Sequence, residues 1–381
     1  MDDTEAMQQA LLCAARVEGR TSPRPPVGAV VVRANTIVGQ GATAPPYGPH
    51  AEVEALLAAG SAAQGATLYV SLEPCCVTIH TPPCTDAIIA AGIKRVVIGT
   101  LDPNPQMSGR GQAKLRAVGI ETTCLNLEQA RELVRPFATF ITRQRPYVTA
   151  KWAMTLDGKL ASGHGDAHWI SGSESRAWVH DLRDRVDAIM IGSQTASHDD
   201  PQLTVRLAAS PGAISRTTRT GPLRVVMATH GQLPAGLQLL QARLAGGTWF
   251  IVGDDCTPDQ YHWLEDCGAG VHTVAVDAQG HVDLAAALQL LAQQGYMHVL
   301  IEGGSQLLGS AFDARCVDRV AAFIAPKIIG GATAPHPLAA PAWVSCPKPG
   351  SFLIVRHTCL VRISLLLVMS IIQKKVKYTY I

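Results

Sequence analysis

The sequence PHAEVEALLAAGSAAQGATLYVSLEPCCVTIHTPPC, residues 49–84, decides the fold of the first half of the chain. An Ala-rich stretch at 51–59 has the composition of a helix, and the apolar run at 66–72 has that of a buried strand. Cys84 stands directly before a second helical stretch at 85–91, which Gly92 closes. Helix alternating with a buried strand predicts an α/β sheet that is covered on both faces.

The same alternation extends outward from this stretch over most of the chain. Further strands are predicted at 27–32, 96–98, 147–153, 188–192, 223–227, 248–252, 298–301 and 320–324, and a first helix at 7–17. The charged, proline-containing segment Arg143-Gln144-Arg145-Pro146 interrupts the pattern and suits a domain boundary near residue 145. We therefore expect two α/β domains.

Length and composition exclude several classes of protein. A chain of 381 residues with 47% hydrophobic residues can build two cores, and ten scattered cysteines are too few for a disulfide framework. A net charge of +2 does not favour nucleic-acid binding. The longest uncharged apolar run, 363–372, has ten residues, about half of a membrane span. The acidic start lacks the features of a secretory signal, so we expect a cytoplasmic protein without membrane contact.

The residues that carry chemistry in the first half are His50, Glu52, Cys75 and Cys84. One imidazole and two thiols form a three-ligand zinc set that leaves the fourth position for water, as in catalytic sites. Residues two apart do not share a helix face, so Glu52 can approach His50 only if His50 stands at the helix start. The two cysteines could instead be buried thiols or a disulfide, and Cys76 is expected to be a packing neighbour.

Spacing and flanking motifs give a resemblance to a known family. The eight-residue gap between the two cysteines, the run 81–84, and the segments 102–106 and 109–111 resemble the deaminase half of the bifunctional riboflavin-biosynthesis deaminase/reductases. The resemblance implies a cytidine-deaminase-like three-layer α/β/α domain with one Zn²⁺ per chain. It also implies zinc-hydroxide deamination of 2,5-diamino-6-(5-phosphoribosylamino)pyrimidin-4(3H)-one, with Glu52 as the catalytic proton shuttle.

The sequence departs from the family around this site. Arg24 stands where the family has an amide that would contact the base, Glu54 replaces a second histidine, and Cys76–His80 replaces a polar, basic stretch. Zinc ligands can persist after a substrate pocket has changed. An enzyme that keeps only the reductase step is therefore the alternative reading.

The second half contains three motifs that are weak singly: KWAMTLDG at 151–158, the segment 195–206, and HVLIEGGS at 298–305. The Gly turn in the last one exposes backbone N–H groups that can hold a phosphate. In this order they resemble the reductase half of the same family, as do Arg183 and the segment 325–331. The resemblance implies a dihydrofolate-reductase-like α/β fold and reduction of the product's ribosyl group to ribityl by NADPH.

The resemblance also implies site residues. The cofactor-binding residues are Met154, Trp169, Thr195, Asp199, Gly303, Gly304 and Ser305, and the substrate-binding residues are Arg183, Leu203, Arg206 and Glu302. The two arginines are natural partners of the substrate phosphate. Ala167 stands where the family often has a serine.

We expect a deaminase domain at 1–144, a reductase domain at 145–363, and a last strand with an atypical tail at 364–381. The expected partner is the small phosphorylated pyrimidine, and the chain is expected to form a homo-oligomer, a dimer or tetramer. Two rivals belong to other classes. A base-flipping nucleic-acid deaminase predicts a basic groove with exposed aromatic residues, whereas a zinc-stabilised assembly module predicts zinc binding without turnover.

Overall fold

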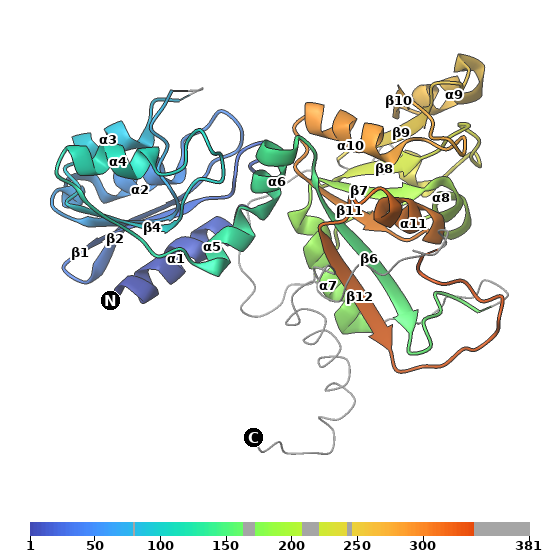
Figure 1. Cartoon of the computed structure of the whole chain (residues 1–381), viewed down its shortest axis with the longest axis horizontal. Coiled ribbons are helices and arrows are strands. Elements are labelled where there is room, and N and C mark those ends of the chain that lie inside the picture. The colour runs from blue at the N-terminus through green and yellow to red at the C-terminus, as the bar shows by residue number, and fades with distance from the viewer. Residues whose placement is uncertain (79–80, 163–171, 208–220, 242–245, 339–381) are drawn as a thin grey trace. The chain divides into compact units, whose positions relative to one another are not determined.

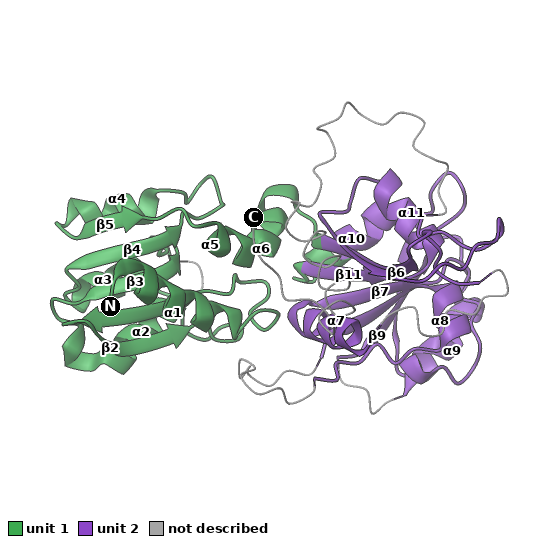
Figure 2. Cartoon of the chain, turned by 90° about the horizontal axis from the view of Figure 1, so that it is seen from below, with its two compact units in different colours: residues 1–147, 209–219, 291–297 green, residues 148–208, 220–290, 298–381 purple. Residues whose placement is uncertain are grey.

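The structure is a computed structural model that describes all residues except 79–80, 163–171, 208–220, 242–245 and 339–381 (Figure 1). The chain forms two compact units (Figure 2). Unit 1 contains 1–147 and 291–297, and unit 2 contains the described parts of 148–208, 220–290 and 298–381. The domain extents expected from the sequence stay a prediction, and the tail at 364–381 lies outside the described residues.

Unit 1 is built on a five-stranded sheet with the order β2-β1-β3-β4-β5. β1 is antiparallel to β2 and β3, whereas β3, β4 and β5 run parallel. The strands are β1 (Gly28–Arg33), β2 (Thr36–Ala42), β3 (Thr67–Leu72), β4 (Arg95–Thr100) and β5 (Glu121–Cys124). The helices are α1 (Asp3–Ala15), α2 (Ala51–Ala59), α3 (Cys84–Ala90), α4 (Arg110–Ala117), α5 (Glu128–Leu133) and α6 (Arg135–Arg143), with a short 3₁₀ turn at Gly60–Ala63.

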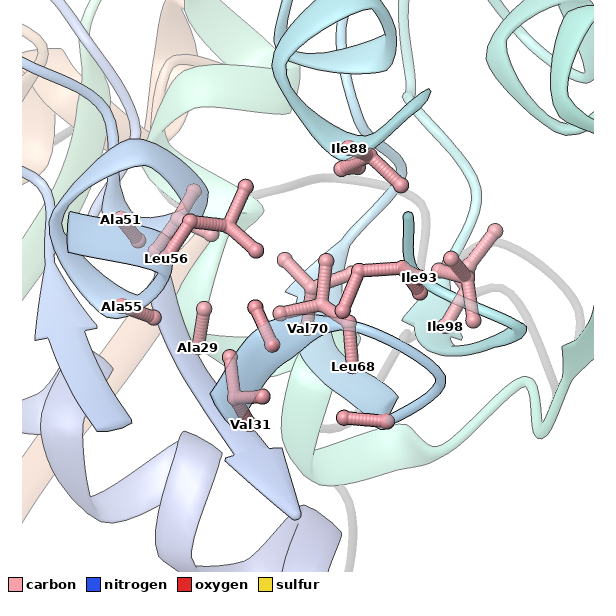
Figure 3. Close-up of a cluster of buried hydrophobic side chains, with 14 of the residues drawn as sticks. Ala29, Val31, Ala51, Ala55, Leu56, Leu68, Val70, Ile88, Ile93 and Ile98 are labelled. Atoms are coloured by element: carbon pink, nitrogen blue, oxygen red, sulfur yellow. The ribbon is translucent and has the colours of Figure 1, made fainter. Parts of the chain in front are cut away.

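Both faces of this sheet are buried, as the uninterrupted apolar strands require. Ala29 and Val31 of β1 point into a cluster with residues of α2 and α3 (Figure 3). Val30 and Val32 point to the other face, into a cluster with residues of α1 and α5. This is a three-layer α/β/α arrangement, so the fold class expected for the first domain is confirmed.

The first helix begins earlier than the apolar pattern predicts. The sequence indicated a helix over 7–17, but α1 already starts at Asp3. The Asp2 side chain accepts a hydrogen bond from the Glu5 N–H at 2.8 Å, and the Glu5 carboxylate accepts one from the Asp2 N–H at 3.0 Å. This capping box satisfies two backbone donors and extends the helix by one turn.

Unit 2 is built on a seven-stranded sheet with the order β10-β9-β8-β7-β11-β6-β12. Parallel pairing joins β10 to β9, β9 to β8, β8 to β7, β7 to β11, and β6 to β12. The strands are β6 (Tyr147–Thr155), β7 (Ala188–Gly192), β8 (Leu223–Met227), β9 (Thr248–Gly253), β10 (Gly270–Val274), β11 (His298–Glu302) and β12 (Arg319–Ala325). The helices are α7 (Ser173–Arg185), α8 (Ser193–Asp199), α9 (Pro258–Asp266), α10 (Leu284–Gln293) and α11 (Ser305–Asp313), with a 3₁₀ turn at Gln238–Leu240.

The central strands of unit 2 form its core and set the position of its loops. Ile189, Val226, Phe250 and Leu300, from four neighbouring strands, are fully buried in one cluster. Because β7 and β11 are parallel neighbours, the segments that follow them leave the sheet at the same edge. The α/β fold expected for the second domain is confirmed. Among the described residues, no helix has both the length and the apolarity that crossing a bilayer demands.

The buried His298 imidazole of β11 should make the stability of unit 2 sensitive to acid. Its Nε2 lies 2.9 Å from Thr149 Oγ1, and burial, together with the nearby Arg319, lowers the pKa of His298 from 6.5 to about 3. The unfolded chain takes up this proton as the pH falls below 6.5, whereas the folded chain does not until about pH 3. Stability is therefore lost in that window, by about 2 kcal/mol at pH 5 relative to pH 8.

The measurement is urea unfolding of the full chain at pH 8 and pH 5, followed with a probe of unit 2. His298→Asn should remove most of this acid-induced loss. The control is His262→Asn, because His262 is 61% exposed and should leave the acid dependence as it is in the unaltered protein. Equal acid dependence of the unaltered protein and His298→Asn would contradict the assignment.

Candidate functional site

The expected metal ligands of unit 1 lie at three junctions between elements. His50 directly precedes α2, Cys75 lies three residues after β3 ends, and Cys84 is the first residue of α3. His50 Nδ1 is 3.2 Å from Cys84 Sγ and 3.6 Å from Cys75 Sγ, and all three ligand atoms lie within 4.8 Å of one another. Ligand bonds of about 2.0 Å to nitrogen and 2.3 Å to sulfur place such atoms roughly 3.5 Å apart around one tetrahedral zinc. The three side chains fit a single zinc ion.

The pKa shifts of the Cys75 and Cys84 thiols are also compatible with metal binding. Hydrogen bonds from the Cys84 side chain and from His50 lower the pKa of Cys75 to about 4. The Cys84 backbone N–H donates to the same sulfur at 3.2 Å. The pKa of Cys84 is raised, first by its bond to Cys75 and then by burial. One thiolate is therefore stable without a cation, and binding a divalent ion would release the second proton.

Two further side chains surround this group. The Glu52 carboxyl lies in the first turn of α2, is 4% exposed, and is not one of the three ligands. Burial, reinforced by the charge of Cys75, raises the pKa of Glu52 to about 7. His50 has an extended backbone and caps α2, which is the position that lets a residue two places later approach the same site. On the other edge of the ring, Thr81 Oγ1 lies 3.5 Å from His50 Nε2.

The sequence analysis gave no role to Glu73, although the structure places its carboxylate at the centre of a bonding network. Glu73 is 5% exposed and accepts three backbone hydrogen bonds. The donors are the N–H groups of Asp102 at 3.1 Å, Gly109 at 2.8 Å and Gln112 at 3.0 Å. This network ties the chain that carries Cys75 to the start of α4. The only signal in the sequence is an acidic residue directly before a Pro-Cys pair.

Gly111 of α4 allows this helix to lie close to the chain segment that carries Cys75. A Cβ atom on Gly111 would lie 2.1 Å from the Pro74 carbonyl oxygen, far inside van der Waals contact. The close approach of α4 to the Pro74-Cys75 peptide therefore requires glycine here. The sequence pattern had shown Gly111 only as part of the family resemblance.

In unit 2 the buried carboxylate of Glu302 organises the expected substrate residues. Glu302 ends β11, and its side chain is 8% exposed. Arg183 of α7 pairs with it through two nitrogens, one at 2.9 Å, and Lys151 Nζ lies 3.9 Å away. Burial alone would raise the pKa of Glu302, but these two cations outweigh that effect and lower it. The carboxylate is therefore ionised and paired, as a buried charge must be.

Helix α7, which carries Arg183, also holds the loop that contains Leu203 and Arg206, the other two expected substrate residues. Arg183 Nη1 donates to the Thr204 carbonyl at 3.1 Å, and His180 Nδ1 accepts from the Arg206 N–H at 3.2 Å. Leu203 is 4% exposed and has a φ of +49°, so the loop is held in a conformation that residues with side chains rarely adopt. Arg183 is thus committed to Glu302 and Thr204, whereas the side chain of Arg206 is exposed.

Four of the expected cofactor residues come together at the edge where β7 and β11 end. Gly303 and Gly304 both have a φ of +77° and form the turn before Ser305, which begins α11. A Cβ atom on Gly304 would lie 3.1 Å from Thr195 Oγ1, so Thr195 of α8 packs on this turn.

The other three expected cofactor residues do not join this turn: Asp199 and Met154 lie elsewhere in unit 2, and Trp169 is outside the residues that the structure describes. Asp199 ends α8, and its side chain is 59% exposed, with Oδ1 2.9 Å from His198 Nδ1. Met154 lies in β6 opposite Ile324 of β12. Trp169, like Ala167, lies outside the described residues. Lys151 and His180, which contact the substrate cluster, had no individual role in the sequence analysis.

Comparisons with known proteins match both halves of the chain. Residues 1–100 match the cytidine and deoxycytidylate deaminase zinc-binding region, and residues 146–342 match the RibD C-terminal domain. The riboflavin biosynthesis protein RibD of Aquifex aeolicus is 43% identical over 329 residues, covering 86% of this chain and 88% of the relative. The RibD protein of Escherichia coli is 36% identical, covering 87% of this chain and 89% of its own length.

Solved structures show the same similarity. The structure of Acinetobacter baumannii RibD, form 1, has a TM-score of 0.76 and 32% identity, covering 89% of this chain and 90% of that one. A Thermotoga maritima structure has a TM-score of 0.75 and 34% identity, covering 90% and 92%. It is described as a diaminohydroxyphosphoribosylaminopyrimidine deaminase/5-amino-6-(5-phosphoribosylamino)uracil reductase.

Replacement of Glu73 by glutamine should weaken unit 1 without changing its shape. The amide keeps one acceptor oxygen but turns an NH₂ group toward backbone N–H donors, so at least one of the three hydrogen bonds is lost. The expected destabilisation is about 2 kcal/mol for a buried charge-assisted network. Calorimetry of the full chain should show the transition of unit 1 lowered by about 4–8 °C.

The control for this variant is Glu121→Gln. Glu121 is 67% exposed and pairs with Arg95 at the surface, so its replacement should leave the transition within about 1–2 °C. A Glu73→Gln protein as stable as this control would show that the three hydrogen bonds do not anchor α4.

Proposed function

The chain belongs to the RibD family of bifunctional deaminase/reductases, and on that premise we propose the substrate and the residues for each of its two reactions. Unit 1 deaminates 2,5-diamino-6-(5-phosphoribosylamino)pyrimidin-4(3H)-one, and unit 2 then reduces the ribosyl group of the product to ribityl. The observation that carries the proposal is the convergence of His50, Cys75 and Cys84 beside the buried Glu52.

The deaminase is a zinc enzyme, and we propose one zinc ion per chain, held by His50 Nδ1 and the sulfurs of Cys75 and Cys84. Zinc in such a site supplies a Lewis acid that lowers the pKa of a water molecule to near neutrality. Deamination replaces the C–NH₂ bond of the ring by C=O, consumes one water and releases ammonia. A group that moves protons between the water and the departing amine is needed as well.

Glu52 is placed to move those protons. Its carboxyl is buried beside the ligands, and hydrogen bonding to the Cys84 side chain orients it toward them. Its raised pKa, caused first by burial, brings the acid and the carboxylate form close in energy near neutral pH. Glu52 accepts a proton from water and delivers it to the amine as the C–N bond breaks.

Unit 2 is a reductase that uses a nicotinamide cofactor, and we propose NADPH. The N–H groups of the Gly303-Gly304 turn and Ser305, with Thr195 against them, suit a pyrophosphate. Met154, Trp169 and Asp199 are proposed as further cofactor contacts. The nicotinamide supplies the hydride when it is bound, and the protein's own task is to hold the ribosyl group against it.

The substrate side of unit 2 is proposed to use Glu302, Arg183, Leu203 and Arg206. Glu302 presents a fixed, ionised carboxylate, which suits hydrogen bonding to sugar hydroxyl groups. Arg183 orients that carboxylate and the Thr204 backbone, and the exposed side chain of Arg206 is available to the phosphate. This arrangement divides the two arginines between positioning and phosphate binding.

The donor set with the buried Glu52 beside it, and the similarity to RibD proteins over most of the chain, favour the two-step enzyme over a chain that retains only the reductase step. Association into a dimer or tetramer and a cytoplasmic location remain predictions. Sedimentation of the purified chain and imaging of a tagged copy would check them.

Glu52→Gln tests the proton-transfer assignment. The amide keeps the shape but cannot exchange a proton, so ammonia release from the diaminopyrimidinone phosphate should fall at least about 100-fold. NADPH oxidation with the deaminated substrate should stay within twofold of the unaltered protein. Zinc content should stay at one ion per chain, since Glu52 is not a ligand.

Glu121→Gln is the matched control because it changes a carboxylate of the same unit that is 67% exposed and pairs with Arg95 at the surface. Its ammonia release should remain within about threefold of normal. Unchanged ammonia release by Glu52→Gln would refute the proton-transfer role, and no ammonia from the unaltered protein would refute the deaminase assignment.

Arg183→Lys tests the reductase cluster. Lysine cannot reproduce the two-nitrogen contact with Glu302 and the contact with Thr204 together, so the carboxylate and the loop both lose their fixed position. NADPH oxidation should fall about tenfold in kcat/KM, about 1.4 kcal/mol in transition-state free energy, while ammonia release stays unchanged. Arg185→Lys, two residues along α7 at an exposed pair with Asp181, should change neither rate. Equal rates for both variants would remove Arg183 from the site.

A further inference from the structure

The loop that leads into His50 has little internal support. It covers residues 44–49, between the end of β2 and the start of α2, and three of its six residues are prolines without an N–H. Its own backbone hydrogen bonds are Ala44 N–H to the Pro49 carbonyl at 3.1 Å and Gly48 N–H to the Pro45 carbonyl at 3.0 Å. Tyr47 at its tip is 83% exposed with a φ of +71°.

The Arg24 guanidinium supplies the hydrogen bonds that the loop cannot make internally. Nη1 donates to the Gly48 carbonyl at 2.8 Å, and Nη2 donates to the Ala44 carbonyl at 2.5 Å and also to the Pro45 carbonyl. Three carbonyls of one short loop therefore converge on one side chain. The planar, five-donor geometry of arginine suits this arrangement, and a lysine ammonium cannot match its fixed spacing.

Arg24 is itself fixed on its other side. Its N–H donates to the Thr21 carbonyl at 2.8 Å, and the Thr21 hydroxyl donates to the Arg24 carbonyl at 2.7 Å. The side chain therefore spans from this rigid turn to the loop. Its Nε is buried and has no hydrogen-bond partner among the described residues, so that donor does not face solvent.

We propose that Arg24 is a positioning residue of the deaminase site, which clamps the loop ending at His50 and thereby fixes the imidazole against the two thiols. The proposal rests on the deaminase function proposed for unit 1. It differs from the expectation drawn from the sequence, in which Arg24 occupies the place of a base-contacting amide and degrades the substrate pocket. Most of the donors of Arg24 are used by the protein's own backbone instead of being directed at a ligand.

The two roles make opposite predictions for metal retention and for substrate affinity. A clamp acts through His50, so its loss should speed zinc release and loosen the loop while leaving substrate affinity unchanged once zinc is saturating. A substrate contact acts on the pocket, so its loss should raise KM and leave zinc release unchanged. Zinc release and KM, measured on the same variant, therefore distinguish a clamp from a substrate contact.

The experiment uses the full chain loaded with zinc and the variants Arg24→Asn and Arg24→Lys. Asparagine restores the amide of the resembled family but is too short to reach the loop, and lysine keeps the charge. Transfer of zinc to a chromogenic chelator should be about tenfold faster in Arg24→Asn and intermediate in Arg24→Lys, the scale at which groups supporting a metal ligand act. Backbone amide exchange of the peptide containing 44–50 should accelerate in the same order.

Arg33→Lys is the matched control, because Arg33 is an exposed arginine at the end of β1 in the same unit. It should match the unaltered protein in zinc release and amide exchange. NADPH oxidation by unit 2 should be normal in every variant, because all the substitutions lie in unit 1. With saturating zinc, KM for ammonia release by Arg24→Asn should stay within twofold.

Two results would overturn the proposal. One is a KM raised tenfold or more in Arg24→Asn with zinc release unchanged, which would make Arg24 a substrate contact. The other is zinc release and amide exchange that match those of Arg33→Lys. Zinc release and amide exchange are independent of turnover, so a failure of the deaminase assignment, seen as absent ammonia release by the unaltered protein, is distinguishable from a failure of the clamp.

Discussion

Burial of the sheet face of unit 1 that α2 and α3 cover is the constraint on which the metal group depends. Because two helices cover this face, the chain twice leaves a strand and starts a helix there, and those junctions supply the ligands. His50 caps one helix, Cys84 begins another, and Cys75 lies just beyond the strand between them in the chain. The start of α3 also favours a thiolate at Cys75, because the Cys84 N–H donates a hydrogen bond to that sulfur. If that face were solvated, this pair of helices would not be needed, and the three separate segments would not be brought within ligand distance.

A buried carboxylate at the end of a strand has the same structural use in both units. Glu73 lies one residue beyond β3 and is satisfied by three backbone N–H groups, which fix the start of α4. Glu302 ends β11 and is satisfied by Arg183 and Lys151, and Arg183 in turn fixes the loop through Thr204. An unpaired carboxylate at such depth would cost several kcal/mol. The partners are therefore obligatory, and each carboxylate holds a loop at a strand end, where sites in α/β folds form.

The sequence predicted what depends on local pattern and on short motifs. The helix at 51–59 and the strands at 188–192 and 223–227 appear with the expected limits, and the convergence of His50 with Glu52 at a helix start is as the spacing required. Strands β2, β5 and β10 were missed because they are short, polar or interrupted by glycine, so that tertiary pairing and not local preference makes them strands. Glu73 was missed for a related reason: a carboxylate that bonds only backbone N–H groups leaves no recognisable partner in the sequence.

The departures from the family show why a residue type at one position does not measure function. Read singly, an arginine in place of a base-contacting amide indicates a lost substrate contact. Arg24, however, acts on the three carbonyls of a loop that contains three prolines, and a proline-rich loop lacks the N–H groups that would bind those carbonyls. The arginine and the prolines thus have to be considered together, because the loop carbonyls would lack these donors without the arginine, and the guanidinium would lack its acceptors without the loop. This pairing preserves the position of His50 and is visible only once the contacts of both partners are known.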